Sequence, residues 1–340
     1  MQIVQPIEAS HEDSIHDVAY DYYGRRMASC SSDHKIKVWD KDPASGKWKC
    51  TAEWKAHQAP VWKLVWAHPE YGQLLASCSF DRTVVIWEDR GRQGTGGAAP
   101  SALPPSDSTV RAPFQMKGSR LDFNQAVNDI AFSPRHVGLQ LAAATNDGFV
   151  TVYEFIDVMD MAQPRVTKFE ASKKGATAIA WSSARFCVPM IVVGTSEGSV
   201  NIWGYSDTFR RWQRLFDLVG NGHSDTVHDV AWAPDIGRSS HVIASCSKDR
   251  TLRVWNIDKE QTNPSTPGDS KSRELVATQV LTEHNAEVWR VQFNVTGTTL
   301  ASSGDDGTVR VWKQDVSNKW TLDGMISGER FARPQGGASD

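Results

Sequence analysis

Serine, histidine and aspartate side chains recur at fixed spacing along the chain, and hydrolases build nucleophilic triads from the same three residue types. In each copy a Ser lies four residues before an Asp, a Trp lies six residues after that Asp, and a His precedes the set. The four sets are His11, Ser29, Asp33, Trp39; His57, Ser77, Asp81, Trp87; His223, Ser245, Asp249, Trp255; and His284, Ser302, Asp306, Trp312. A catalytic triad occurs once and converges on a cleft, whereas this set returns in each repeat. We therefore interpret it as a structural hydrogen-bond network within each repeat and predict no enzymatic activity.

The remaining reactive groups give no sign of a metal or cofactor site. The five cysteines, Cys30, Cys50, Cys78, Cys187 and Cys246, form no CxxC pair and no zinc-ligand spacing. Three of them share one context, SCSSD, SCSFD and SCSKD, and so would lie in different structural units, too far apart for a disulfide. We expect free thiols in a reducing compartment.

The elements that position these residues are short strands. An acid followed six residues later by an aromatic recurs six times, in SSDHKIKVW, SFDRTVVIW, TNDGFVTVY, TSEGSVNIW, SKDRTLRVW and GDDGTVRVW. An apolar run precedes each acid and an alternating run follows it, which predicts a hairpin. A further strand precedes each hairpin, starting at Ile15, Val61, Val127, Ala176, Val227 and Val288. A fourth strand is indicated in KWKCTAEW, RWQRLF and KWTLDGM. Such four-stranded repeats are typical of a β-propeller.

The sequence thus predicts an all-β, six-bladed WD-repeat β-propeller as one domain over residues 1–327. The expected blades cover residues 8–55, 56–123, 124–170, 171–220, 221–281 and 282–327. Copies three and four lack the His, carry Ala143 and Val193 in place of the Ser, and have Tyr153 for the Trp and Glu197 for the Asp. We interpret them as blades in which apolar contacts replace the network.

Composition narrows the possible partners and the location. The formal net charge is −3 and no strongly basic stretch is present, which argues against direct nucleic-acid binding. No apolar run approaches the length of about 18 residues that spans a membrane. The N-terminal residues lack the pattern of a signal peptide, so we expect an intracellular protein. Polar, Gly- and Pro-rich insertions at 89–113 and 259–274 and a polar tail at 328–340 are predicted to be flexible.

The two ends of the repeat array suggest an open ring. A closed propeller usually lets one terminus supply a strand to the blade at the other end. Here the sixth copy has its own fourth strand, because Trp320 follows Trp312 much as Trp48 follows Trp39. Exposed strand edges are templates for another chain. We therefore expect a partner to complete the ring with a blade of its own; the alternatives are closure by six blades alone or an unrecognised strand over 3–7.

Several longer phrases resemble one family. They are HEDSIHDVAYDYYGRRMASCSSDHKIKVW, FSPRHVGLQLAAATNDGFVTVYE, AWAPDIGRSSHVIASCSKDRTLRVW and DDGTVRVWKQ. These phrases are similar to the small WD-repeat nucleoporins of the Seh type, and the resemblance covers about residues 1–327. The sister family, the small propeller of the outer COPII coat, shares the opening IHD…DYYG phrase but matches the later repeats less well.

The resemblance implies a specific role. Similar proteins are open six-bladed propellers completed by a blade from an α-helical nucleoporin in the nuclear pore Y-complex, where they support transport of protein and mRNA. They also serve in the vacuolar or lysosomal complex of the SEA/GATOR type that regulates TOR signalling. Localisation at the nuclear pore and on the cytoplasmic face of the vacuole or lysosome membrane is implied too. The edge residues that would contact the partner are Ile3, Val4 and Ile7 on one side and Trp320, Leu322 and Met325 on the other.

The opening of the central channel is a second candidate binding surface. The residues five after each His, or aligned with them, are expected near the opening of the central channel: His16, Trp62, Asn128, Thr177, His228 and Trp289. They could bind a peptide, as in a substrate-recruiting adaptor, or Trp62 and Trp289 could simply pack on neighbouring blades. Two alternative functions therefore remain beside that of a scaffold subunit: a vesicle-coat propeller and a substrate-recruiting adaptor.

Overall fold

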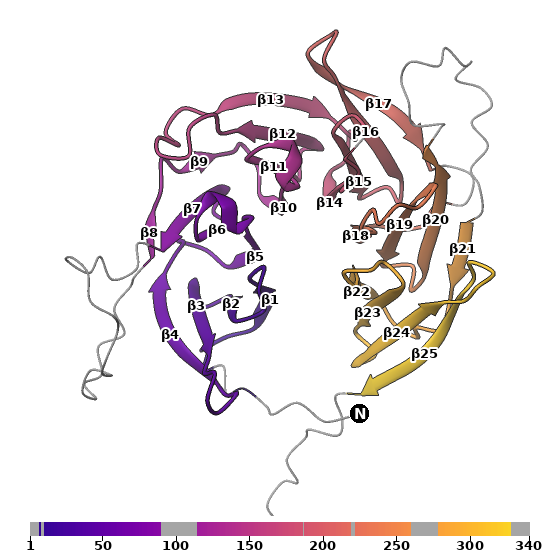
Figure 1. Cartoon of the computed structure of the whole chain (residues 1–340), viewed down its shortest axis with the longest axis horizontal. Helices are drawn as coiled ribbons and strands as arrows, with labels where there is room; N and C mark the ends of the chain where they lie inside the picture. Colours follow the sequence, from indigo (N-terminus) through magenta and orange to yellow (C-terminus); the bar gives the residue numbers. More distant parts are fainter. Residues whose placement is uncertain are drawn as a thin grey trace, which may run out of the picture. The chain divides into compact units, whose positions relative to one another are not determined.

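The computed structural model describes residues 7, 10–89, 114–185, 187–218, 222–259 and 278–327. Most of the two predicted insertions and the whole C-terminal tail lie outside these residues, as do Ile3 and Val4. Within the described part nearly all of the regular secondary structure is β-strand, and Figure 1 shows the strands grouped into sheets. The sequence prediction of an all-β, six-bladed propeller is confirmed.

Each of the six sheets is one blade and follows the order of the chain. The first three blades are β1 (Ile15–Tyr20), β2 (Arg26–Ser31), β3 (Lys35–Lys41), β4 (Trp48–Lys55); β5 (Val61–Trp66), β6 (Leu74–Ser79), β7 (Thr83–Asp89), β8 (Phe114–Met116), β9 (Leu121–Asp122); and β10 (Val127–Phe132), β11 (Gln140–Thr145), β12 (Phe149–Glu154), β13 (Arg165–Glu170). The last three are β14 (Ala176–Trp181), β15 (Met190–Thr195), β16 (Val200–Ser206), β17 (Arg211–Asp217); β18 (Val227–Trp232), β19 (Ser240–Ser247), β20 (Leu252–Asp258), β21 (Thr278–Leu281); and β22 (Val288–Phe293), β23 (Thr299–Gly304), β24 (Thr308–Gln314), β25 (Trp320–Ser327).

The tight turn after each acid determines the hairpin geometry. In all six turns the residue that follows the acid has a positive φ: His34, Arg82, Gly148, Gly198, Arg250 and Gly307. A single left-handed residue at the end of a tight turn is typical of a three-residue hairpin loop, such as residues 32–34 between β2 and β3, but this conformation costs a residue with a Cβ about 1–2 kcal/mol. In the second and fifth turns the carboxylate offsets part of that cost, because Asp81 and Asp249 each accept a hydrogen bond from the Thr two residues later.

The last strand of a blade is the element that the sequence predicted least completely. In the second blade β8 and β9 both pair with β7, so that this strand is split in two. Gly118 lies in the break with a φ of 75°, and a Cβ there would come within 2.7 Å of the Met161 carbonyl oxygen. The break therefore requires glycine. No alternating pattern marks β8, β9, β13 or β21 in the sequence.

The chain divides into two compact units, 1–146 with 151–167 and 147–150 with 168–340. Within each unit, neighbouring blades share an apolar core. In the first unit Ile36 and Val38 of β3 pack with Leu64, Leu75 and other residues of the second blade. In the second unit the corresponding Leu252 and Val254 of β20 pack with residues of the sixth blade. We call the side of a blade turned to the following blade its forward face, and the opposite side its backward face.

The first and sixth blades are complete without each other. Every described strand of the sixth sheet comes from residues 288–327, and every described strand of the first comes from residues 15–55. Among the residues that the structure describes, no terminal strand crosses from one blade to the other. The only helices described are two single-turn 3-10 helices, Pro69–Tyr71 and Arg135–Val137, and no described helix could span a membrane.

Candidate partner-binding surface

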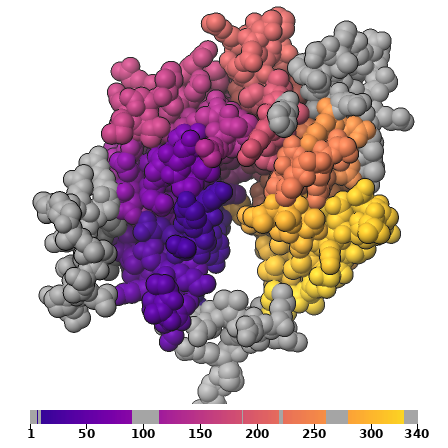
Figure 2. All heavy atoms as spheres, in the orientation of Figure 1, coloured from indigo at the N-terminus to yellow at the C-terminus, as the bar shows by residue number. Residues whose placement is uncertain are grey.

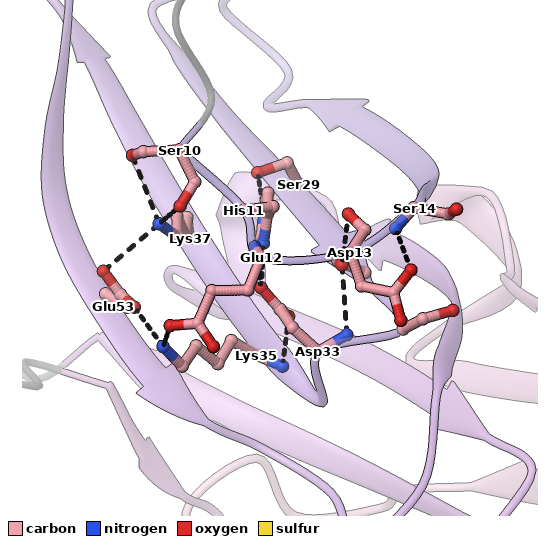
Figure 3. A network of polar contacts seen from close by, with 12 residues as sticks. Ser10, His11, Glu12, Asp13, Ser14, Ser29, Asp33, Lys35, Lys37 and Glu53 are labelled. Carbon is pink, nitrogen blue, oxygen red and sulfur yellow. Dashed lines mark hydrogen bonds and ion pairs between the residues drawn. The ribbon is translucent and has the colours of Figure 1, made fainter.

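The repeated His, Ser, Asp and Trp side chains form one hydrogen-bond chain in each of four blades. In the first blade His11 bonds through Nδ1 to Asp33 Oδ2 at 2.8 Å and through Nε2 to Ser29 Oγ at 2.9 Å. The Trp39 indole N–H donates to the same Ser29 oxygen at 3.0 Å. Figure 3 shows the ring of His11 between its two partners.

The other three chains repeat these contacts closely. The distances from His Nδ1 to the Asp oxygen are 3.0, 2.9 and 2.9 Å in the second, fifth and sixth blades. The distances from His Nε2 to Ser Oγ are 2.7, 2.9 and 2.8 Å, and those from the Trp N–H to Ser Oγ are 2.9, 3.2 and 2.9 Å. The four sets join the turn, the hairpin and the preceding loop of their own blade.

The electrostatics of the networks favour a fixed ionised carboxylate. Burial acts to raise the pKa of Asp306, but hydrogen bonds from Thr308 and His284 outweigh it and lower the pKa to about 2. The same balance holds the pKa of Asp81 and Asp249 well below the usual range. Burial lowers the pKa of His284 although Asp306 opposes that shift.

This arrangement is unsuited to nucleophilic chemistry. Ser77, Ser245 and Ser302 are buried, and each hydroxyl oxygen already accepts the indole N–H of the Trp in its blade. A nucleophile needs an accessible oxygen beside its base. Among the described residues no group of His, Cys, Asp and Glu could hold a metal ion either, and all five cysteines are free thiols.

The third and fourth blades replace the network in different ways. In the third blade Phe123 lies where the His would be, and its ring contacts Tyr153 edge-on with centroids 5.9 Å apart. In the fourth blade Val193 leaves the Trp203 indole N–H with no hydrogen-bond partner in the described structure, and Phe169 packs on that ring at 4.5 Å. Aromatic contacts therefore stand in place of the hydrogen-bond chain.

A second polar contact holds the start of the first blade, and the sequence reasoning did not find it. Lys37 is 4% exposed, and its ammonium donates to the Ser10 carbonyl at 2.8 Å and pairs with Glu53 at 3.4 Å. Figure 3 shows Lys37 between these two partners. The contact fixes the chain at Ser10 against β3 and β4.

The residues expected near the channel opening pack on one another between neighbouring blades. His16 of the first blade lies 4.7 Å from Trp62 of the second, and Trp62 contacts Phe80 at 5.2 Å. In the second unit His228 stacks on Trp289 with centroids 4.0 Å apart, and the Trp289 N–H donates to Asp305 at 2.8 Å. Asn128 and Thr177 are half-buried. Trp62 and Trp289 each contact a His of the neighbouring blade within their own unit, and Trp289 remains 37% exposed.

The backward face of the first blade is uncovered at its first strand. Val18 is 47% exposed, whereas the corresponding aliphatic residue in the other five blades is at most 4% exposed. These residues are Leu64, Ile130, Ile179, Val230 and Val291. Tyr20, two residues after Val18, is also exposed and contacts Trp48 edge-on at 5.7 Å. An apolar surface that a preceding blade of the same unit covers in the second, third, fifth and sixth blades is open here.

The forward face of the sixth blade is uncovered in the same manner. Val309 is 39% exposed, whereas Ile36, Val84, Val150, Val200 and Leu252 at the same place in the other blades are 0% exposed. Val309 pairs across the strands with Ile326, which is 41% exposed, whereas Trp54 paired with Ile36 is 8% exposed. In Figure 2 the atoms of this blade, in yellow, form part of the surface of the second unit. We call the two surfaces the end faces.

The structure places the three expected edge residues of β25 away from the end face of the sixth blade. Trp320 is 2% exposed and belongs to the apolar core shared by the fifth and sixth blades. Leu322 and Met325 pair with Trp312 and Arg310, which point to the backward face, so both lie away from the end face. Residues opposite each other in antiparallel strands share a face, and a shift of one residue reverses it. Ile326 and Val309 are the apolar residues on the end face; Ile7 is half-buried in the described structure.

Comparisons with known proteins agree with this architecture. The family described as WD domain, G-beta repeat matches residues 4–40, 48–88, 214–256 and 275–313, and each match contains one of the four complete networks. Nucleoporin SEH1-A of Xenopus laevis is 41% identical over 97% of this chain and 89% of its own length. The chain belongs to the SEH1 family of WD-repeat nucleoporins. Nucleoporin SEH1 of Homo sapiens and of Bos taurus are both 40% identical over 96% of this chain and 89% of their own lengths. As a member of this SEH1 family the chain is a structural WD-repeat protein and not an enzyme.

Proposed function

We propose that this chain is a scaffold subunit of the nuclear pore Y-complex that binds an α-helical nucleoporin through the end faces. The partner would contribute a blade of β-strands to the ring, and the assembly would support transport of protein and mRNA. The observation that carries the proposal is the exposure of Val18 and Val309 at places where every other blade is buried. The SEH1 relatives are named nucleoporins, which supports a location at the nuclear pore.

The chemistry of the end faces favours β-strands as the occupant. Val309 and Ile326 correspond to residues that a following blade covers in the rest of the chain. Fully burying an aliphatic side chain of this size contributes about 1.5–3 kcal/mol. Val18, Val309 and Ile326 are 39–47% exposed, so a partner blade that reproduced this packing would gain roughly half of such a contribution from each of them.

The proposal extends to a second assembly. We propose that the same surface serves in a SEA/GATOR-type complex at the cytoplasmic face of the vacuole or lysosome membrane, where it would contribute to TOR signalling. An adaptor function through Trp62 and Trp289 is less well supported, because both rings are already engaged by a His of the neighbouring blade. The SEH1 identity of the relatives favours the pore over a vesicle coat.

The experiment compares Val309→Asp with Val316→Asp. Val316 is fully exposed in the turn between β24 and β25 and does not lie on an end face, so it is a matched control. Each tagged full-length variant is expressed in cells of the organism that makes this protein, and the helical nucleoporin that co-purifies is identified by mass spectrometry. The Kd of the complex between that nucleoporin and each variant is then measured with purified proteins. We expect Val309→Asp to weaken binding about a hundredfold and Val316→Asp to leave it unchanged. Equal binding by both variants would contradict the proposal.

A further inference from the structure

The third residue of the first strand connects the first, second and fifth blades to the blade that follows each of them. In chain order the residues at this position are Asp17, Lys63, Asp129, Ala178, Asp229 and Arg290. Asp17 Oδ2 accepts a hydrogen bond from the Leu64 backbone N–H of the second blade at 3.0 Å. Asp229 Oδ2 accepts one from the Val291 N–H of the sixth blade at 3.0 Å. The two contacts repeat the same geometry in separate units.

An irregularity in the strands makes these contacts available. The register between the first two strands shifts between Val61 and Lys63, and again between Val288 and Arg290. A bulge of this kind removes one residue from the ladder, so that a nearby backbone N–H needs another acceptor. A carboxylate from the preceding blade supplies it for Leu64 and for Val291.

In the second blade an ion pair makes the connection to the next blade. Lys63 points forward and its ammonium lies 3.3 Å from Asp129 Oδ1, at the same position of the third blade. Asp129 is 3% exposed, so the carboxylate is well shielded from water, whereas the Lys63 side chain remains 18% exposed. A cation at the third position of one blade is thus matched by a carboxylate at the third position of the blade that follows.

The sixth blade has Arg290 at this position, and the blade that would follow it belongs to the proposed partner. We propose that Arg290 selects a partner whose blade carries an Asp or Glu at the third position of its first strand. This inference rests on the proposed function and specifies the partner chemically. A guanidinium can bind a carboxylate with two parallel hydrogen bonds, which adds orientation as well as charge.

The test uses full-length chain and the helical nucleoporin that co-purifies with it. A photo-crosslinking amino acid at position 290 identifies the contacting segment, which should contain an Asp or Glu within an alternating apolar pattern. Arg290→Glu should weaken the Kd at least about tenfold, whereas Arg290→Lys should retain most of the affinity. Lys319→Glu, an equal charge reversal at an exposed turn residue off the end face, is the control and should bind as the unmodified chain does. Changing the identified carboxylate to Lys should restore binding to Arg290→Glu.

The outcomes separate this inference from the proposed function. If Val309→Asp loses the partner while Arg290→Glu binds normally, the end-face proposal stands and the role of Arg290 is wrong. A crosslinked segment without a carboxylate overturns the inference as well. If both variants bind normally, both proposals fail. Thermal unfolding of each isolated variant checks that it is folded. If the charge reversal prevents folding, Arg290→Met replaces Arg290→Glu, and it should also bind the partner at least about tenfold more weakly than the unmodified chain does.

Discussion

Replacing Ser77 with alanine removes an acceptor that two buried groups of the second blade share. The Ser77 hydroxyl bonds to His57 Nε2 at 2.7 Å and accepts the Trp87 N–H at 2.9 Å, and the serine is 0% exposed. Each buried polar group left without a partner costs about 1–3 kcal/mol. We therefore expect Ser77→Ala to lower the free energy of unfolding by about 2–6 kcal/mol, a large part of the total of about 5–15 kcal/mol for a typical domain.

The third blade suggests a compensating variant. It has Phe123, Ala143 and Tyr153 at the corresponding places and forms a complete sheet. The triple variant His57→Phe, Ser77→Ala, Trp87→Tyr transfers this set to the second blade. Replacing all partners by apolar contacts leaves fewer groups stranded than removing one. We expect the triple variant to be at least as stable as Ser77→Ala alone.

Urea unfolding followed by circular dichroism measures these differences. Ser224→Ala, at an exposed serine next to another network histidine, is the control and should change the free energy of unfolding by less than about 0.5 kcal/mol. A loss below about 0.5 kcal/mol for Ser77→Ala would refute the reasoning that the networks hold buried groups together. So would a triple variant much less stable than the single one.

Three further predictions concern stability and solubility. Gly148→Ala should be far more destabilising than Gly307→Ala. Both glycines have a positive φ, but only at Gly148 would a Cβ come within 1.7 Å of another atom, the Ser172 carbonyl oxygen. Thermal unfolding of both variants checks the order of their stabilities. Burial of His241 lowers its pKa to about 4, so the unfolded chain binds more protons than the folded chain between pH 6.5 and about 4. The free energy of unfolding should therefore fall by up to about 3 kcal/mol as pH drops through that window. His241→Gln should flatten this dependence of stability on pH, as measured by urea titrations. Expressed alone, the chain should be poorly soluble and should become soluble when co-expressed with its helical partner, as fractionation of lysates will show.

Local spacing carried most of what the sequence predicted correctly. The interval from acid to aromatic and the alternating residues after it identified every hairpin, because turn conformation and strand period are local properties. The network members could be paired for the same reason, since one blade holds all four. The split strand around Gly118 could not be predicted, because its cause is the close approach of the distant Met161 backbone.

The polar contacts between blades were beyond the sequence reasoning. The carboxylate of Asp17 reaches a backbone N–H that lies 47 residues further along the chain, and nothing in its own strand indicates the acceptor role. The sequence did not indicate that Trp320 lies in the core, because only the pairing register decides which face of β25 a residue occupies. The repeated third position of the first strand was a usable signal, since an acid stands there in three copies.

Hydrogen exchange on the isolated chain and on its complex tests most directly whether the end faces are uncovered until a partner binds. The account predicts that amides of β1, β24 and β25 exchange faster in the isolated chain than amides of β16 and β20, whose blades are covered on the corresponding faces. In the complex with the helical nucleoporin those three strands should become as protected as the others. Full protection of β1, β24 and β25 in the isolated chain would contradict the account.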